Sequence, residues 1–187
     1  MPTIPLLPAP VNLYRDASRS SQRIRQKEKR ITRKTLDTLV HLPEFTITHF
    51  SIEQRREESI LHLCGKHNYD YAICPQCKSV SESIHQEKPR CVRDLDISKH
   101  RTFLHFISRR FSCEHCKHTF VERLQSIGFG HRQTERFQEV VYQRSLSSTH
   151  KSVAKEMWLD PSTVKTIFLR LAKDKLDEEN QTLVSAN

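Results

Sequence analysis

The six cysteines of this chain are the residues whose chemistry decides most about its function. Four of them form two pairs with CxxC spacing, Cys74–Cys77 and Cys113–Cys116, and residues 78–112 separate the pairs. A tetrahedral Zn²⁺ site takes four thiolate ligands from two tight turns, and one CxxC directs two sulfurs at one ion. The spacing therefore predicts a closed, structural zinc site formed by these four side chains.

Other roles for the cysteines require a different context. A redox CxxC opens a helix in a thioredoxin-like unit, and neither pair has that context. A catalytic zinc keeps an open coordination position, which four thiolates would fill. A site in which Cys64 and His67 join Cys74 and Cys77 is an alternative ligand set. If it does not form, we expect Cys64 and Cys91 to be small buried side chains in strands.

The residues around the two pairs bear on the shape of the site. The position after the second cysteine of a zinc knuckle often requires a positive φ angle, which favours glycine. Here Lys78 and Lys117 occupy it and add positive charge. We expect His115 and His118 to lie at the surface or beside the ligands, because four cysteines already fill the site.

Two strand-like patterns must position the cysteine pairs. Residues 42–63 contain two short alternating runs joined by charged residues, which predicts a β-hairpin. Between the pairs, HRTFLHFISRRFSC alternates with Phe103 and Phe111 on one side and Leu104 and Phe106 on the other. HTFVERL predicts another short strand. Residues 41–124 are therefore expected to form a β-hairpin and a zinc ribbon.

After this region the period of the pattern changes from two to 3.6 residues. Residues 125–133 hold two of the three glycines and predict a linker. Residues 134–176 predict three helices, with Thr134 as an N-cap and Asp160-Pro161 as the start of the third. The fold class expected is α+β, a small β-rich zinc ribbon followed by a three-helix domain. Residues 177–187 predict a polar tail.

The stretch VAKEMWLDPSTVKTIFLRL fits a helix-turn-helix, with Trp158 or Leu159 where such turns often carry glycine. An ordinary three-helix bundle with a solvated face is the alternative. In the helix-turn-helix, a short polar and cationic face of the third helix would reach base edges and phosphates in a major groove. The DNA contacts expected there and nearby are Ser162, Thr163, Lys165, Thr166, Arg170, Lys151, Arg109 and Arg110.

Composition agrees with an acidic partner. The net charge of the 187 residues is +9 and the pI is near 9.4, which favours nucleic acid. Residues 1–40 predict a basic arm, flexible or partly helical, that either contacts the phosphate backbone or keeps the chain in solution. We expect no membrane span, no secretion signal and no small-molecule substrate, and a cytoplasmic, nucleoid-associated location.

Four features of the chain, taken in order, resemble the N-terminal half of ISL3-family transposases. They are CPQC, RDLD at residues 93–96, RRFSCEHCKHTFVERL and the helix-turn-helix. LPEFTITHFSIE resembles the segment before their zinc ribbon. The resemblance covers about residues 42–175. It implies that the cysteine pairs bind zinc, that residues 162–170 belong to the recognition helix, and that the two regions bind the terminal inverted repeats of the element.

In that family a DDE catalytic domain follows, and we expect none in this chain, because the sequence stops at Asn187. The expected function is thus DNA binding without strand transfer. The partner is double-stranded DNA, with a full-length transposase or a second copy of the chain as a protein partner. A domesticated transcriptional regulator and a ribbon that binds RNA or protein are the alternatives.

Overall fold

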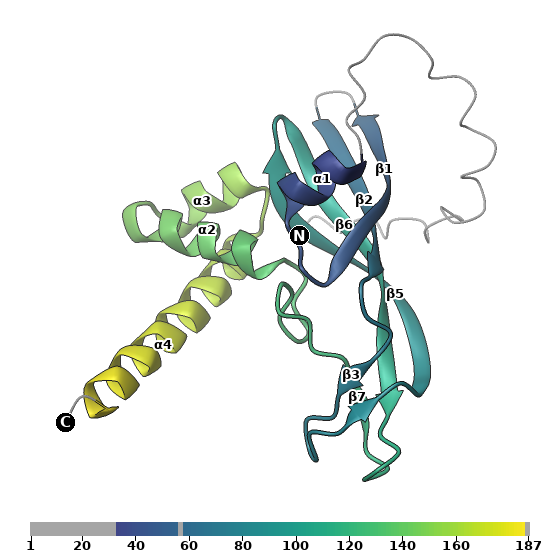
Figure 1. The fold of residues 1–187 in the computed structure, drawn as a ribbon. Coiled ribbons are helices and arrows are strands. Elements are labelled where there is room, and N and C mark those ends of the chain that lie inside the picture. Colours follow the sequence, from purple (N-terminus) through teal and green to yellow (C-terminus); the bar gives the residue numbers. More distant parts are fainter. Residues whose placement is uncertain (1–32, 56–57, 186–187) are drawn as a thin grey trace, which may run out of the picture. The chain divides into compact units, whose positions relative to one another are not determined.

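A computed structural model of the protein describes residues 33–55 and 58–185. Most of the expected basic arm, residues 1–32, lies outside the described residues, as do residues 56–57 in the expected charged turn and 186–187. The elements, in chain order (Figure 1), are α1 (Arg33–Val40), β1 (Phe45–Arg55), β2 (Glu58–His67), β3 (Ala72–Ile73), β4 (Val80–Ser81), β5 (Ile84–Ile97), β6 (His100–Ser112), β7 (Thr119–Val121), α2 (Glu135–Ser147), α3 (His150–Met157) and α4 (Pro161–Ser185).

The main sheet is made of two antiparallel hairpins lying side by side, in the strand order β1-β2-β6-β5. The predicted first hairpin is confirmed, with Phe45 opposite His67 and a β-bulge between Ile47 and His49. The hairpins join through β2 and β6, which run parallel. Farther along, β7 pairs with β6 at Arg110–Ser112, on the side opposite β5. β6 therefore continues from the main sheet into the cysteine-rich end.

Side chains on the two faces of β6 pack into two separate cores. Leu104 and Phe106 are buried with α1 and both hairpins. Phe111 and Cys113, which have the opposite parity, are buried in a much smaller cluster with Cys74 and Phe120. Because alternate side chains of a strand point to opposite faces, the long β5–β6 hairpin presents one face to each core. We call residues 72–81 and 111–121, which surround the smaller cluster, the ribbon tip.

The three C-terminal helices bury the apolar stripes that the sequence predicted. Thr134 caps α2, because its hydroxyl accepts a hydrogen bond from the Phe137 N–H at 3.4 Å. The described residues contain four helices, one more than predicted, because α1 precedes the sheet. The shared core of α2, α3 and α4 contains Phe137, Val141, Val153, Ala154, Met157, Val164 and Ile167.

None of the helices in the part of the chain that the structure describes combines the length and the apolar character that crossing a membrane requires.

Candidate functional site

The four cysteines of the two CxxC pairs meet at the ribbon tip. One sulfur from each of these side chains lies within 4.8 Å of the others. The Sγ atoms of Cys74 and Cys116 are 3.6 Å apart, and those of Cys77 and Cys113 are 3.4 Å apart. Zn–S bonds of about 2.3 Å in a tetrahedron place sulfurs about 3.8 Å apart, so the cluster fits a zinc ion closely. The set of donors, four cysteines and no disulfide, is that of a structural zinc site.

Each cysteine pair lies in the same kind of turn. The Lys78 N–H donates to the Cys74 carbonyl, and the Cys74 N–H donates to the Ser79 carbonyl, both at 2.9 Å. The second turn repeats this arrangement at 2.9 Å, with Lys117 bonded to Cys113. The positive φ predicted after each pair is present, at 64° for Lys78 and 58° for Lys117. Both turns therefore hold a lysine in a conformation that glycine adopts more easily.

Replacing either lysine with glycine is expected to stabilise the ribbon tip. The left-handed conformation costs a non-glycine residue roughly 1–2 kcal/mol, and glycine loses about 0.5–1 kcal/mol through its freedom in the unfolded chain. The net gain for Lys78→Gly or Lys117→Gly is then about 0.5–1 kcal/mol. Urea denaturation at fixed free zinc measures it. Lys78→Ala removes the same side chain without relieving the backbone, so equal stability of the glycine and alanine variants would contradict this explanation.

The surroundings of Cys77 favour its thiolate. The hydroxyl and the backbone N–H of Ser79 lower the pKa of Cys77 to about 5. Cys74 and Cys113 are buried, whereas Cys77 and Cys116 are half-buried at the edge of the tip. With four thiolates as ligands, an ion bound here would have no open position for a substrate. The site can therefore hold structure together and offers no place for metal chemistry.

The other candidate ligands lie elsewhere. Cys64 is buried in β2, and the His67 Nε2 is 2.6 Å from the Ile107 carbonyl oxygen, so this pair does not join the cluster. His118 is exposed and stacks on Phe120. Cys91 lies in a strand as expected, but the expectation that it is buried was wrong. Its side chain is on the edge strand β5, where it is exposed.

The helix-turn-helix geometry is present in α3 and α4. Trp158 ends α3 with a φ of 55°, and its N–H donates to the Ala154 carbonyl, so it takes the conformation for which such turns often use glycine. Asp160 caps α4, because its carboxylate accepts from the Ser162 N–H at 2.8 Å and from the Ser162 hydroxyl at 2.6 Å. The start of α4 is thus fixed by local hydrogen bonds.

The predicted DNA contacts divide into two groups by exposure. The first group is accessible to solvent. At the start of α4 it contains the exposed Ser162, Lys165 and Thr166 and the half-buried Thr163. It also contains Lys151, exposed at the start of α3, and Arg110, exposed on β6. The other group consists of Arg109, which is buried, and Arg170, which is half-buried.

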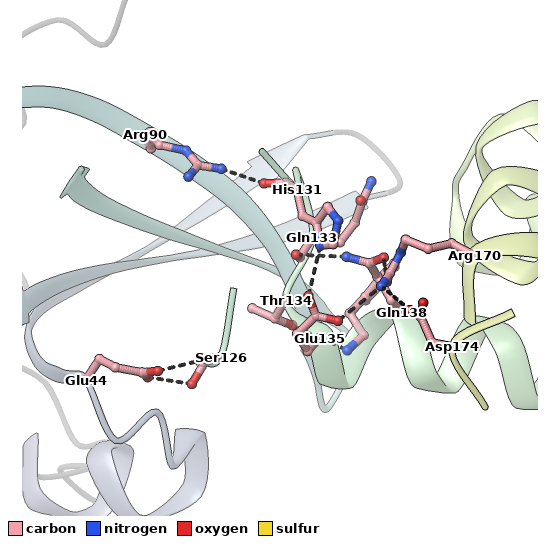
Figure 2. Close-up of polar contacts among 11 residues, drawn as sticks. Glu44, Arg90, Ser126, His131, Gln133, Thr134, Glu135, Gln138, Arg170 and Asp174 are labelled. Atoms are coloured by element: carbon pink, nitrogen blue, oxygen red, sulfur yellow. Dashed lines mark hydrogen bonds and ion pairs between the residues drawn. The ribbon is translucent and has the colours of Figure 1, made fainter. Parts of the chain in front are cut away.

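The guanidinium of Arg170 joins α4 to α2. It donates to Gln138 at 2.6 Å and to Asp174 at 3.2 Å, and it lies 3.5 Å from Glu135 (Figure 2). Arg109 is buried and donates to the Glu122 carboxylate and to the Tyr69 carbonyl. This packing favours a structural role for both arginines, and their contact with DNA stays a prediction.

Residues 125–133 lie against the sheet along much of their length. Glu44 accepts from the Ser126 N–H at 2.8 Å and from its hydroxyl at 2.5 Å, and Arg90 donates to the His131 carbonyl at 2.5 Å (Figure 2). Gly130 has a φ of 76°. At Gly128 a Cβ atom would lie 2.1 Å from the His131 ring. The glycines that predicted a linker therefore allow a tight connection that is hydrogen-bonded to the sheet.

The junction between β5 and α2 was missed by reasoning from the sequence. Asp94 is fully buried and accepts from Thr134 and from Arg136, both at 2.7 Å. Its neighbour Arg93 is also buried. The RDLD stretch at residues 93–96 carried a signal, because two aspartates and an arginine are unusual within a strand. Nothing in the stretch itself indicated the distant partners.

Comparisons with known proteins agree with this geometry. Residues 70–116 match the zinc-finger of transposase IS204/IS1001/IS1096/IS1165, a range that contains all the cysteines of the cluster. Residues 122–172 match the helix-turn-helix domain of transposase family ISL3. The transposase for insertion sequence element IS1001 from Bordetella parapertussis is 37% identical over 95 residues, which are 51% of this chain and 23% of that protein. The chain thus spans about a quarter of this relative's length. No solved structure matches the chain.

Proposed function

We propose that this chain, which carries the zinc-ribbon and helix-turn-helix region of ISL3-family transposases, binds double-stranded DNA at the terminal inverted repeats of its element. The matches to the zinc-finger of transposases, to the helix-turn-helix domain of transposase family ISL3 and to an insertion-sequence transposase support the element as target. In this role the zinc holds the ribbon in shape, and α4 contacts bases. The same role would place the chain at chromosomal DNA in the nucleoid.

The observation that carries the proposal is the exposed surface of the first two turns of α4. Ser162, Lys165 and Thr166 are exposed there, and Lys151 is exposed at the start of α3. In helix-turn-helix proteins the N-terminal residues of the second helix reach base edges, and the first helix crosses the phosphate backbone. Hydroxyl groups and a lysine at those positions suit base and phosphate contacts.

We assign recognition and not strand transfer to the described residues. Two-metal chemistry requires carboxylates that gather around the ions. The buried carboxylates Asp94 and Glu122 are each paired with an arginine. Within residues 33–55 and 58–185, the group of side chains able to hold a metal consists of the four cysteines. A full-length transposase or a second copy of the chain is the protein partner that such a role would involve.

The proposal is tested by DNA binding at several salt concentrations. Each phosphate contact that is lost lowers the slope of log affinity against log salt by about one. The double variant Lys151→Ala/Lys165→Ala is therefore expected to lower the slope by up to about two and to weaken binding to duplex DNA. Fluorescence anisotropy with a labelled duplex from an element end measures both.

The matched control is Lys173→Ala, an exposed lysine farther along the same helix. It is expected to leave the slope close to that of the wild type. An effect of Lys173→Ala equal to half that of the double variant, that is, the same effect per removed charge, would show that only the overall charge matters. Binding of the wild type that does not respond to salt would refute the DNA-binding function.

A further inference from the structure

The helix-turn-helix and the ribbon sheet share an extensive junction where β5 ends and α2 begins. We propose that this junction makes the two regions one rigid DNA-binding body, so that the spacing between the DNA segments they contact becomes a determinant of target choice. The inference rests on the proposed DNA-binding function. The positioning residues are Arg93, Asp94 and Arg136.

The first part of the junction is a backbone bridge. The Arg93 N–H donates to the Arg132 carbonyl, and the Thr134 N–H donates to the Arg93 carbonyl, both at 2.9 Å. These bonds form a short parallel bridge between Arg93 and Gln133, on the edge strand β5. The chain is thus hydrogen-bonded to the sheet immediately before α2 begins. A hinge at this point would have to break both bonds.

The second part is an ion pair between a buried carboxylate and a half-buried arginine. Asp94 is fully buried, and two nitrogens of the Arg136 guanidinium contact its two oxygens, one at 2.7 Å. Arg136 also donates to the Val40 carbonyl at the end of α1. One side chain therefore joins α1, β5 and α2. A bidentate pair of this kind fixes orientation as well as distance.

The third part places one cation between rings from the two regions. The Arg93 guanidinium lies 5.2 Å from the ring centre of Phe103 in β6 and 5.3 Å from that of Phe137 in α2. It also pairs with Asp96 at 2.5 Å. Leu95, which lies between Arg93 and Asp96 in the sequence, packs against the core of the helices α2–α4. The end of β5 thus belongs to the helical core as much as to the sheet.

Rigidity has a direct consequence for DNA recognition. Exposed cations occur on both regions, including Arg110 on β6, Lys117 on the ribbon tip and Lys165 on α4. Two extra base pairs between the contacted segments move one of them by about 7 Å and rotate it by about 70° around the duplex. A flexible tether would follow this change, whereas a rigid junction would lose one set of contacts.

The experiment compares the wild type with the double variant Asp94→Asn/Arg136→Gln. This change replaces the ion pair with neutral amides, so that neither residue leaves a buried unpaired charge. The control is Arg144→Gln/Glu156→Gln, which removes an exposed ion pair between α2 and α3. The zinc-loaded wild-type chain first selects its sites from a random duplex library. Affinity is then measured on the selected site and on copies with one or two base pairs inserted between its contacted segments.

The wild type and the control are expected to lose at least about tenfold in affinity on the two-base-pair insertion. The junction variant is expected to bind the selected site less tightly and to differ by less than about threefold among the probes. The inference is overturned if the wild type tolerates the insertions, if the junction variant discriminates as the wild type does, or if the selected site contains one contacted segment only. In those cases DNA binding itself still stands. If the wild type selects no duplex site, the proposed function fails.

NMR relaxation of the free wild-type protein gives a second readout that does not depend on DNA or on the folding of the variant. Equal rotational correlation times for the hairpin β1–β2 and for the helices α3–α4 are expected. Different correlation times for the two would overturn the inference.

Discussion

Removal of the zinc is expected to unfold the ribbon tip and to leave the main sheet and the helices folded. The buried cluster at the tip contains two zinc ligands, Cys74 and Cys113, and two aromatic rings, Phe111 and Phe120. Segments this small rarely fold without a metal or a disulfide. The tip therefore has little apolar burial of its own once the metal has gone.

The expected size of the effect is large. Structural zinc sites in small domains bind with apparent free energies of about 10–16 kcal/mol at neutral pH. The sheet keeps a separate core beside α1, with Leu63, Leu104 and Phe106 each almost fully buried. The helices keep a third core. The loss should therefore be local, because neither larger core includes a zinc ligand.

Amide hydrogen exchange and two-dimensional NMR, with and without a strong chelator, measure this directly. Protection should disappear at residues 72–81 and 111–121 and persist in β1, β2 and α2. Cys77→Ser should reproduce the effect of the chelator, and Cys64→Ser, which changes a buried cysteine outside the cluster, should not. Loss of protection in the helices as well would mean that the metal supports the whole fold.

The sequence predicted the features whose cause is local. The zinc ligands followed from the CxxC spacing, and the positive φ at Lys78 and Lys117 followed from their position in a knuckle. Caps such as Thr134 are recognisable because a cap bonds to residues two or three positions away. Each of these features involves a few neighbouring residues, so the pattern of those residues is sufficient.

The features that the sequence did not predict depend on distant partners. The parallel pairing of β2 with β6 joins Ser59 to His100, and no local pattern specifies it. The partners Asp94 and Arg136 are likewise far apart in the chain. The apparent linker at residues 125–133 contains glycines and polar residues, a composition that suits both a flexible tether and a tight connection. Only the hydrogen bonds of residues 125–133 to the sheet show that this segment is a tight connection and not a flexible tether.

The adjacent arginines Arg109 and Arg110 provide the second large prediction. Both appeared to be candidate DNA contacts, but neighbouring residues of a strand face opposite sides. The Arg109 side chain is 7% exposed, and its Nη2 lies 2.7 Å from the Glu122 carboxylate, which is 4% exposed. Arg110 is exposed on the same strand. One of the two should therefore matter for folding and the other for binding.

Replacing Arg109 with methionine is expected to destabilise the fold by about 3–5 kcal/mol, because it leaves the buried Glu122 carboxylate without the guanidinium and, among the described residues, with only the His67 ring, at 3.4 Å, as a partner in an ion pair. Arg110→Met should change the free energy of unfolding by less than about 0.5 kcal/mol. Urea denaturation at fixed free zinc measures both. In DNA binding under folded conditions, Arg110→Met should reduce the salt dependence by about one contact if this arginine meets a phosphate.

The double variant Arg109→Met/Glu122→Gln separates the two causes of instability. It removes the buried charge together with its partner, so it should recover part of the loss caused by Arg109→Met alone. Equal losses in the single and the double variant would mean that packing, and not the unpaired carboxylate, dominates. Were Arg110→Met the more destabilising single change, the assignment of faces along β6 would be wrong. The alternation of this one strand thus decides which of two identical side chains supports the structure and which is available to DNA.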